Sequence, residues 1–526
     1  MQVTTLSKKL PLSLSPYQAF YRLTGGNSTH TALLETAEAG THHNPKSLLM
    51  ISAAARVSAR NSEITIEALN DNGESLLADL ELETIAADFD INRQQKSIAL
   101  TLKSITTSIE ELERLKSVSS LTILKFLARQ CEAENREDNQ STNLIGACSF
   151  DLVDQFESLP VVEKLTDDFC FYVADQLLIQ SLDNQSAKLI CKGFGSNAKN
   201  KIRLGVALEQ MQHRLVEQIS DNKHNFKFDN LVSAKSDQDS ELVTVSLSDQ
   251  EFAKKVEKAK QRIIDGDAFQ VVLSRNYQVA CEDPFLAYGK LRQSNPSPYM
   301  FYIQFEQGTL LGASPESALK VDANQEISLY PIAGTRKRAF TAKGIDSEED
   351  SRIEYELVSD EKEVAEHMML VDLARNDIAR IAKSGTRKVT QLKAVVKYSH
   401  VMHLVSEVKA QLSRDFDMFD AYRACANMGT LTGAPKIKAN EIIRQLEQSA
   451  RGYYGGAVCV FNANQEFDSA IVIRSAYVCN DVATISAGAG IVYDSCPKKE
   501  CAETYHKALP VINACIPMES KQKEVA

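Results

Sequence analysis

An α+β fold, with large and mostly antiparallel β-sheets flanked by helices, is indicated by three features of this sequence. Apolar or alternating runs typical of strands recur along the chain, for example at residues 169–178, 269–279 and 455–461. Neighbouring runs are often close in sequence, which favours antiparallel pairing. Helix-forming stretches are mixed with these strands, and the combination is typical of an α+β fold.

Two parts are expected, because 526 residues are too many for one ordinary core. Residues 221–240 are rich in Asp, Asn, Lys and Ser and predict a boundary, which gives an N-terminal domain over residues 1–240 and a C-terminal domain over residues 241–526. In the first domain, strands are expected within residues 31–59 and at 187–191, and a helix around residues 207–219.

Helices are expected in the second domain where the sequence gives start signals. Ser and Asp precede a run of helix formers within residues 245–264. Asp360, with Glu363 three residues later as a capping partner, should open a long helix that runs to about Ala382. Pro435 suits the first turn of another helix, and a last helix is expected from about Lys499.

The composition excludes several classes of protein. A net charge of -11 argues against nucleic acid as the main partner, because phosphate binding needs a basic face. No apolar stretch is long enough to span a bilayer, and the N-terminus lacks the apolar core of a secretory signal. The 11 cysteines contain no CxxC pair, which disfavours zinc and fits free thiols in a reducing compartment. A cytoplasmic protein without a membrane partner is expected.

A first candidate for chemistry is the segment at residues 360–381. Glu363, Glu366 and His367 lie within one turn, so a helix would present Glu363 with Glu366 or His367 on adjoining parts of one face. Carboxylates aimed into a site are what a hard magnesium ion requires. A charged, solvated helix with its apolar residues facing a core fits the same pattern, and the segment alone leaves both interpretations open.

A second candidate lies at residues 485–504. A strand leads into Gly488–Ala489–Gly490, where small side chains let a ligand approach the backbone amides. A helix then carries Glu500 and Glu503 three residues apart on one face. A plain tight turn explains the glycines equally well.

Residues 429–443 resemble a phosphate loop only superficially. Lys436 does not directly follow a glycine, and no Ser or Thr follows it, so the spacing fails. At residues 330–338 a strand ends in Gly–Thr and a cluster of cations.

Taken together and in order, six strings resemble the chorismate-binding family of enzymes. They are residues 360–377 (DEKEVAEHMMLVDLARND), 401–408 (VMHLVSEV), 429–436 (GTLTGAPK), 451–458 (RGYYGGAV), 468–476 (DSAIVIRSA) and 486–492 (SAGAGIV) with the AET that follows at 502–504. The resemblance covers roughly residues 245–515. Residues 33–38 (LLETAE) and 46–50 (KSLLM) resemble the N-terminal domain of the same enzymes. The two-part fold of that family is therefore expected.

The resemblance implies a site for chorismate, a dicarboxylate with an enolpyruvyl ether, and for Mg²⁺. It offers Glu366 and Glu503 as magnesium ligands, and the ion would in turn hold a substrate carboxylate. Arg474 would bind the other carboxylate through its planar guanidinium group. The rest of the pocket would be lined by Gly334, Thr335, Tyr454, Gly488, Ala489 and Gly490.

Enzymes of this family add a nucleophile at one ring carbon while a hydroxyl leaves from another, and a hydroxyl leaves well only when it is protonated. The resemblance offers Glu316 as the general acid, His403 for proton handling and substrate polarisation, and Thr430 for a hydrogen bond nearby. A buried histidine bonded to a carbonyl group is the ordinary alternative for His403.

Two positions indicate which reaction of the family is expected. In relatives that attack with water, a lysine near the Gln270 position activates that water; in aminodeoxychorismate synthases, a lysine commonly stands at the Ala333 position. Ammonia is already a nucleophile and needs less activation, so the absence of both lysines resembles the anthranilate synthases. These convert chorismate and ammonia to anthranilate and pyruvate, the first committed step of tryptophan biosynthesis. The alternatives are an aminodeoxychorismate synthase component I and a catalytically inactive regulatory paralogue.

The ammonia is expected to come from a second protein. No segment resembles a glutamine amidotransferase, because a nucleophile-elbow cysteine flanked by glycines is missing and residues 146–150 (GACSF) lack the following Gly-Gln. A separate glutamine amidotransferase subunit, and hence a hetero-oligomer, is the prediction.

The resemblance also implies feedback inhibition by tryptophan, bound by Glu35, Thr36, Lys46, Pro298, Tyr299 and Met300. Glu35 can meet the ligand's ammonium group, while Tyr299 and Met300 offer an apolar wall for the indole ring. Thr36 departs from the family's usual serine, keeping the hydroxyl but adding a methyl group. The ordinary alternative places Glu35 at a strand end in solvent and residues 298–300 in a turn that enters a strand.

Overall fold

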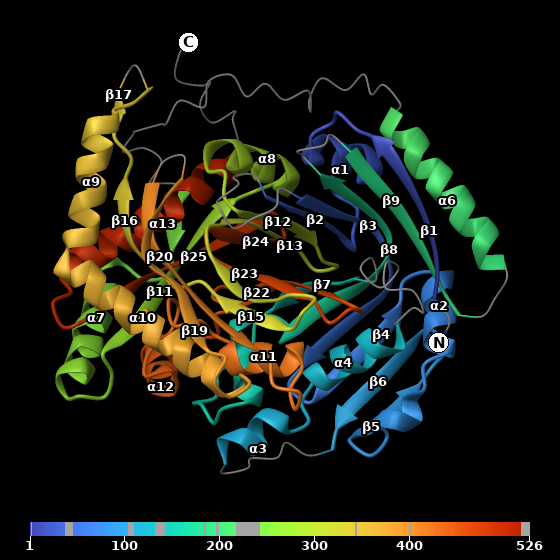
Figure 1. Cartoon of the computed structure of the whole chain (residues 1–526), viewed down its shortest axis with the longest axis horizontal. Coiled ribbons are helices and arrows are strands. Elements are labelled where there is room, and N and C mark those ends of the chain that lie inside the picture. Colours follow the sequence, from blue (N-terminus) through green and yellow to red (C-terminus); the bar gives the residue numbers. More distant parts are fainter. Residues whose placement is uncertain are drawn as a thin grey trace.

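The computed structural model describes residues 1, 3–36, 46–103, 110–131, 143–181, 186–195, 199–216, 242–341, 344–398 and 401–516 (Figure 1). Apart from the small β17–β18 pair, the described strands form one continuous sheet system. Its strands pair in antiparallel fashion, and helices lie around its outside. The predicted α+β architecture is confirmed. None of the described helices is both long and apolar enough to cross a membrane.

The first 216 residues contribute the right-hand side of the molecule in Figure 1. Their strands are β1 (Val3–Pro11), β2 (Thr31–Glu35), β3 (Lys46–Arg60), β4 (Glu63–Ala68), β5 (Phe89–Arg93), β6 (Ser97–Leu102), β7 (Asn143–Cys148), β8 (Phe169–Ser181) and β9 (Ser186–Phe194). Their helices are α1 (Pro16–Thr24), α2 (Asp71–Ala78), α3 (Glu111–Lys116), α4 (Leu121–Gln130) and α6 (Lys199–Val216), with the 3₁₀ helices η1 (Leu82–Ile85) and η2 (Phe150–Gln155).

The remaining elements follow from residue 242 onward. The strands are β10 (Thr244–Val245), β11 (Gln270–Ala280), β12 (Tyr299–Gln304), β13 (Thr309–Ser314), β14 (Ser317–Val321), β15 (Glu326–Leu329), β16 (Ile332–Lys337), β17 (Phe340–Thr341), β18 (Gly344–Ile345), β19 (Lys388–Lys397), β20 (Val401–Gln411), β21 (Gly433–Ala434), β22 (Ala457–Asn462), β23 (Phe467–Ile471), β24 (Ser475–Cys479) and β25 (Val482–Ile491). The helices are α7 (Asp249–Ile264), α8 (Pro284–Ser294), α9 (Ser347–Ser359), α10 (Glu361–Ala379), α11 (Met418–Cys425), α12 (Lys436–Glu447) and α13 (Pro497–Cys515).

Helices α7, α10 and α12 begin close to the residues at which the sequence predicted helix starts. Ser248 caps α7 in a reciprocal box with Glu251. Asp360 caps α10 by accepting hydrogen bonds from two backbone amides of its first turn. Glu363 does not complete that cap, because its carboxylate pairs with Arg336 instead. Pro435 stands just before α12 as its N-cap residue rather than within the first turn.

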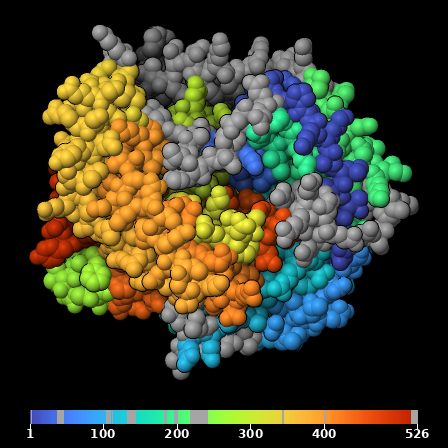
Figure 2. All heavy atoms as spheres, viewed as in Figure 1, coloured from blue at the N-terminus to red at the C-terminus, as the bar shows by residue number. Residues whose placement is uncertain are grey.

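Strands from the two halves of the chain pair directly with each other. β2 pairs with β12, and β7 pairs with β22. The largest apolar cluster accordingly contains buried residues from both halves of the chain, for example Ala54 and Ile471. Figure 2 shows the two halves, blue to green and yellow to red, meeting as one body. The predicted boundary at residues 221–240 lies outside the described residues, so the division at residue 240 stays a prediction.

Candidate active site

A buried carboxyl group, that of Glu316, lies in the turn between β13 and β14. Its backbone carbonyl accepts a hydrogen bond from Ile471 N at 3.0 Å, which ties the turn to the end of β23. The side-chain Oε1 accepts a hydrogen bond from Thr430 Oγ1 at 2.8 Å. Burial raises the pKa of Glu316 to about 7, although Thr430, Lys507 and Arg474 act in the opposite direction. Glu316 therefore exchanges a proton near neutral pH, as a general acid must.

His403 lies on β20 with its ring nitrogen Nδ1 turned toward β16. Nδ1 is 3.2 Å from Gly334 O and 3.0 Å from Thr335 Oγ1. A carbonyl oxygen can only accept, so Nδ1 carries the proton and Nε2 keeps its lone pair. Burial lowers the pKa of His403 to about 4, against the raising effect of Gly334 O. The imidazole is therefore neutral at physiological pH.

Arg474 connects β23 to β24 with a backbone φ of 50°, a conformation that is uncommon for a residue with a Cβ atom. Its carbonyl oxygen accepts a hydrogen bond from Ala313 N at 3.0 Å, which fixes the bend. The half-buried guanidinium group makes no hydrogen bond or ion pair with any residue that the structure describes. Burial lowers its pKa, while the charges of Glu503 and Glu316 and the Tyr454 hydroxyl raise it. Such a cation is available for an anionic ligand.

Gly488, Ala489 and Gly490 lie inside strand β25, opposite β11, and not in a tight turn. A Cβ atom on Gly488 would stand 2.7 Å from Tyr454 Oη, and one on Gly490 would stand 2.9 Å from Gln270 Nε2. Only glycine leaves room for these two side chains against the strand. Tyr454 and Gln270 therefore border the floor that the three small residues form.

Carboxylates of α10 and α13 lie within electrostatic reach of one another. The charge of Glu503 raises the pKa of Glu366 and that of Glu500, in both cases after burial as the main cause. Lys362 lies 3.7 Å from Glu366, and Lys507 lies 2.6 Å from Glu503. Among the residues that the structure describes, no group of three or more His, Cys, Asp or Glu side chains is closed around one metal position.

Lys507 is a residue that the sequence did not single out. It follows Glu503 by one helical turn, and its Nζ donates a hydrogen bond to Gly488 O at 2.9 Å. Its charge lowers the pKa of Glu316. The cation thus links the carboxylates of α13 to the floor of the site. The only sequence signal for it was the spacing of four from a predicted ligand.

Two neighbouring features of the sequence have structural roles. Lys436, from the string that resembled a phosphate loop, pairs with Asp377 at 2.6 Å and donates hydrogen bonds to two carbonyl groups at the end of α11. His367 is fully buried, and its Nε2 lies 2.6 Å from Ser406 Oγ. This hydrogen bond joins α10 to β20.

A separate cavity of about 270 Å³ lies between β2, β12 and the strands β22 and β23. All six residues predicted for a tryptophan site line it: Glu35, Thr36, Lys46, Pro298, Tyr299 and Met300. Glu35 is buried rather than at a solvent-exposed strand end, since it pairs with Met300 across β2 and β12.

Glu35 is already partly occupied. Its Oε1 accepts hydrogen bonds from Tyr288 Oη and Arg292 Nε, both at 2.7 Å. Its Oε2 is buried and has no hydrogen-bond partner among the described residues. Tyr299 Oη donates a hydrogen bond to Asp468 Oδ1 of β23 at 3.5 Å. Leu34, Leu48 and Val458 give the cavity apolar walls, and Asp468 adds a carboxylate.

The structure therefore brings the predicted residues together at two places. Those offered for chemistry and substrate binding gather around β11, β25 and the ends of β16, β20 and β23, and the two predicted metal ligands are neighbours there. Those offered for tryptophan form the second cavity. The Arg474 cation lies within electrostatic reach of the buried Glu316, and this pair suits the binding of a small anionic molecule.

A model of the chorismate binding enzyme family matches residues 85–513 of the chain. The chain therefore belongs to the chorismate-binding enzyme family. Anthranilate synthase component 1 of Vibrio cholerae is 42% identical over 515 residues, which cover 97% of this chain and 96% of the relative. The protein of that name from Escherichia coli K12 is 41% identical over 513 residues, covering 95% and 94%.

Two solved structures are similar to this fold. Anthranilate synthase component I from Streptococcus pneumoniae matches with a TM-score of 0.65 and 27% identity, covering 90% of this chain and 95% of the other. MenF, the menaquinone-specific isochorismate synthase of Escherichia coli, matches with a TM-score of 0.66 and coverage of 98% and 95%. At 15% identity, this second likeness extends to the fold alone.

Proposed function

We propose that this chain adds ammonia to chorismate and then releases pyruvate to give anthranilate. The observation that carries the proposal is the buried Glu316, whose pKa of about 7 and hydrogen bond from Thr430 suit a general acid. Arg474, which pairs with none of the described residues, lies within its electrostatic reach. The relatives named anthranilate synthase component 1, which align over nearly the whole chain, support the choice of reaction.

Substrate binding follows from charge and space. The guanidinium group of Arg474 can hold one carboxylate of chorismate bidentately. Tyr454 and Gln270 fill the space that a Cβ atom would take on Gly488 and Gly490, so these two side chains would form the surface that the ring contacts. Burial strengthens the attraction between Arg474 and the anion, because little water remains to screen it.

Departure of the ring hydroxyl requires a proton. The hydrogen bond from Thr430 occupies Oε1 of Glu316, so the transferable proton resides on Oε2. With a pKa of about 7, a large fraction of Glu316 is protonated at neutral pH, and the proton can pass to the leaving oxygen. His403 is neutral, its Nε2 has no hydrogen-bond partner among the described residues, and it can accept a proton later in the reaction, while Gly334 O keeps its ring in place.

Glu366 and Glu503 would hold the magnesium ion. Mg²⁺ is commonly bound by one or two carboxylates with water and substrate oxygens completing the shell, so two glutamates within electrostatic reach of each other fit it and a closed protein cage is not required. Lys362 and Lys507, which pair with these carboxylates, must turn aside when the ion binds. A metal ion held by these two residues would supply positive charge for the second carboxylate of chorismate.

Ammonia as nucleophile fits the polar groups beside the floor. Gln270 Nε2 lies next to Gly490, at the place where a lysine activates water in the water-using relatives. A neutral amide cannot serve as a base, and ammonia needs none to attack. A separate glutamine amidotransferase subunit would supply the ammonia, as the name component 1 of the relatives suggests.

The cavity that β2, β12, β22 and β23 line would bind tryptophan as an inhibitor. Its volume of about 270 Å³ suits an amino acid with an indole ring. The Glu35 side chain is fully buried and binds Tyr288 and Arg292, so it would have to turn toward the cavity to meet the ligand's ammonium group. Tyr299 and Met300 would provide apolar contact.

The purified chain, incubated with chorismate, Mg²⁺ and an ammonium salt, should produce anthranilate, which is measured by its fluorescence. Glu316→Gln should abolish production while leaving the thermal unfolding midpoint unchanged. Accumulation of aminodeoxychorismate or isochorismate in place of anthranilate would contradict the proposal.

A further inference from the structure

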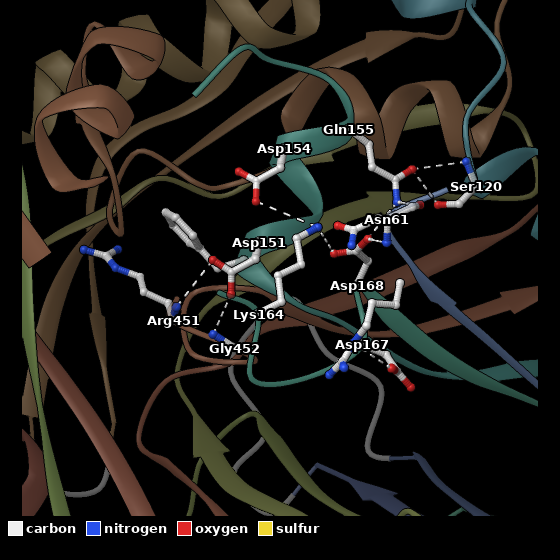
Figure 3. A network of polar contacts seen from close by, with 12 residues as sticks. Asn61, Ser120, Asp151, Asp154, Gln155, Lys164, Asp167, Asp168, Arg451 and Gly452 are labelled. Atoms are coloured by element: carbon white, nitrogen blue, oxygen red, sulfur yellow. Dashed lines mark hydrogen bonds and ion pairs between the residues drawn. The ribbon is translucent and has the colours of Figure 1, made fainter. Parts of the chain in front are cut away.

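The 3₁₀ helix η2, from the N-terminal half of the chain, lies against the turn that begins the 451–458 string. Phe150 N donates a hydrogen bond to Gly452 O at 2.8 Å, and Asp151 Oδ2 accepts one from Gly452 N at 2.7 Å. Figure 3 shows the Asp151 side chain pointing at the backbone of Arg451 and Gly452. Two consecutive residues therefore bind both backbone polar groups of Gly452. The turn has a φ of 60° at Gly452, which glycine adopts without strain.

Asp151 is buried together with its counterion. Its Oδ1 lies 2.7 Å from Arg444 Nη2, and the exposed fractions of the two side chains are 2% and 1%. Asp154 Oδ1 lies 3.0 Å from the same nitrogen. Arg444 Nε and Nη1 have no hydrogen-bond partner among the described residues. The desolvation of two buried charges costs free energy that an ion pair with unsatisfied donors does not fully recover. Stabilisation of the fold alone therefore does not explain why the two segments are joined by this pair.

The same helix also holds the loop that carries Thr430. Phe150 O accepts a hydrogen bond from Asn427 Nδ2 at 3.0 Å. The Phe150 ring lies 4.6 Å from the Arg451 guanidinium group, which donates a hydrogen bond to Leu431 O at 2.7 Å. The loops that provide Thr430 and Tyr454 to the candidate active site therefore share one support.

The far end of η2 is fixed as well. Gln155 donates hydrogen bonds to Asp168 Oδ2 at 2.8 Å and to Asn61 O at 2.9 Å, and it accepts one from Ser120 Oγ at 2.8 Å (Figure 3). Lys164 pairs with Asp168 in the same network. A helix held at both ends is a rigid support for what it contacts.

We propose that Asp151 is a positioning residue for the amination of chorismate, because it fixes the Gly452 turn and, with Phe150, the Asn427 loop, and so places Tyr454 and Thr430 against the substrate. The inference rests on the proposed function, since its readouts are kinetic. Asp151 itself does not touch the substrate; it acts through the two loops.

Asp151→Asn and Asp154→Asn form a matched pair. Each removes one carboxylate charge from the same Arg444 guanidinium group, but only Asp151 binds Gly452 N. Asp151 binds Arg444 through Oδ1 and the Gly452 amide through Oδ2. Asparagine has only one side-chain oxygen, so at position 151 it loses one of these two contacts. Asp154 has an exposed fraction of 24%, and its replacement leaves both loops untouched.

Asp151→Asn is expected to lower kcat for anthranilate formation by at least about tenfold, because small displacements of reacting groups are costly. It should also move the alkaline fall of kcat/KM to higher pH, because a displaced Thr430 no longer stabilises the Glu316 carboxylate. Asp154→Asn should keep both values near wild type. Equal losses in the two variants, or a folded Asp151→Asn enzyme with wild-type kcat and pH profile, would overturn the proposal.

If Asp151→Asn does not fold, Asn427→Gly tests the same contact between η2 and the loop that carries Thr430. It removes the hydrogen bond to Phe150 O but keeps the positive φ of 54° at this position accessible. The same alkaline shift is expected, and its absence overturns the proposal. A wild-type chain that makes no anthranilate overturns the proposed function and this inference with it; an active wild type with unaffected variants overturns only this inference.

Discussion

Replacing Thr430 by valine isolates the hydrogen bond that tunes the candidate general acid. Thr430 Oγ1 donates to Glu316 Oε1 at 2.8 Å, and this contact lowers a pKa that burial raises to about 7. Valine keeps the shape and removes the donor. A hydrogen bond to a charged group contributes about 1.5–3 kcal/mol, and one pKa unit corresponds to about 1.4 kcal/mol. Its loss should therefore raise the pKa of Glu316 by about 1–2 units.

The direction of the kinetic effect follows from the role of Glu316. A general acid is active while protonated, so kcat/KM is high below its pKa and falls as the pH rises through it. In the wild type the fall should centre near pH 7, and in Thr430→Val near about pH 8–9. The variant should thus retain a larger share of its own maximal activity at alkaline pH.

The assay is the initial rate of anthranilate formation, followed by fluorescence across the pH range at a constant concentration of free ammonia. Thr430→Ser keeps the hydroxyl group and should leave the alkaline fall in place, which makes it the matched control. An unchanged fall in Thr430→Val, or an equal shift in Thr430→Ser, would refute the assignment of Glu316 as the acid.

Other expectations concern the metal, the partner and the inhibitor. Glu366→Gln or Glu503→Gln should reduce turnover more than about 100-fold without changing the unfolding midpoint. Glu361 is an exposed residue on α10, and Glu361→Gln should leave turnover unchanged. Normal activity of Glu503→Gln at limiting Mg²⁺ would contradict the assignment. The isolated chain should use ammonium salts but not glutamine, and product from glutamine alone would refute the need for a second subunit. Tryptophan should raise the apparent KM for chorismate, and Met300→Thr should relieve this without loss of basal activity. The chain contains no tryptophan, so indole fluorescence reports only the ligand.

Much of the fold could be predicted because its signals are local. The capping residues Ser248 and Asp360 and the apolar run of β8 each determine an element without distant partners. Helix α9 was not expected, since only Asp350 and Leu357 of its residues are buried and no apolar stripe marks it. It is held largely by charge: Asp350 pairs with Arg338 at 2.8 Å, and that contact lowers the pKa of Asp350 to about 2.

Spacing alone could not settle the site. Glu500 and Glu503 are equivalent by sequence, yet Glu500 is buried and Glu503 is half-exposed opposite Glu366. Whether the glycines of β25 form a turn or a strand depends on their partners in β11, which are about 215 residues away. The support from Asp151 was likewise invisible, because its contacts to Arg444 and Gly452 are non-local.

Strand β23 connects the second cavity to the active site. Asp468 to Ala470 line the cavity, and the next residue, Ile471, donates its amide to the carbonyl of Glu316. Three residues further on, Arg474 takes up its positive φ. A ligand that binds more tightly to one position of β23 would therefore shift Glu316 and Arg474 together. A ligand that binds all positions of β23 equally well would shift neither residue. This continuity explains physically how tryptophan could raise the chorismate requirement without entering the active site.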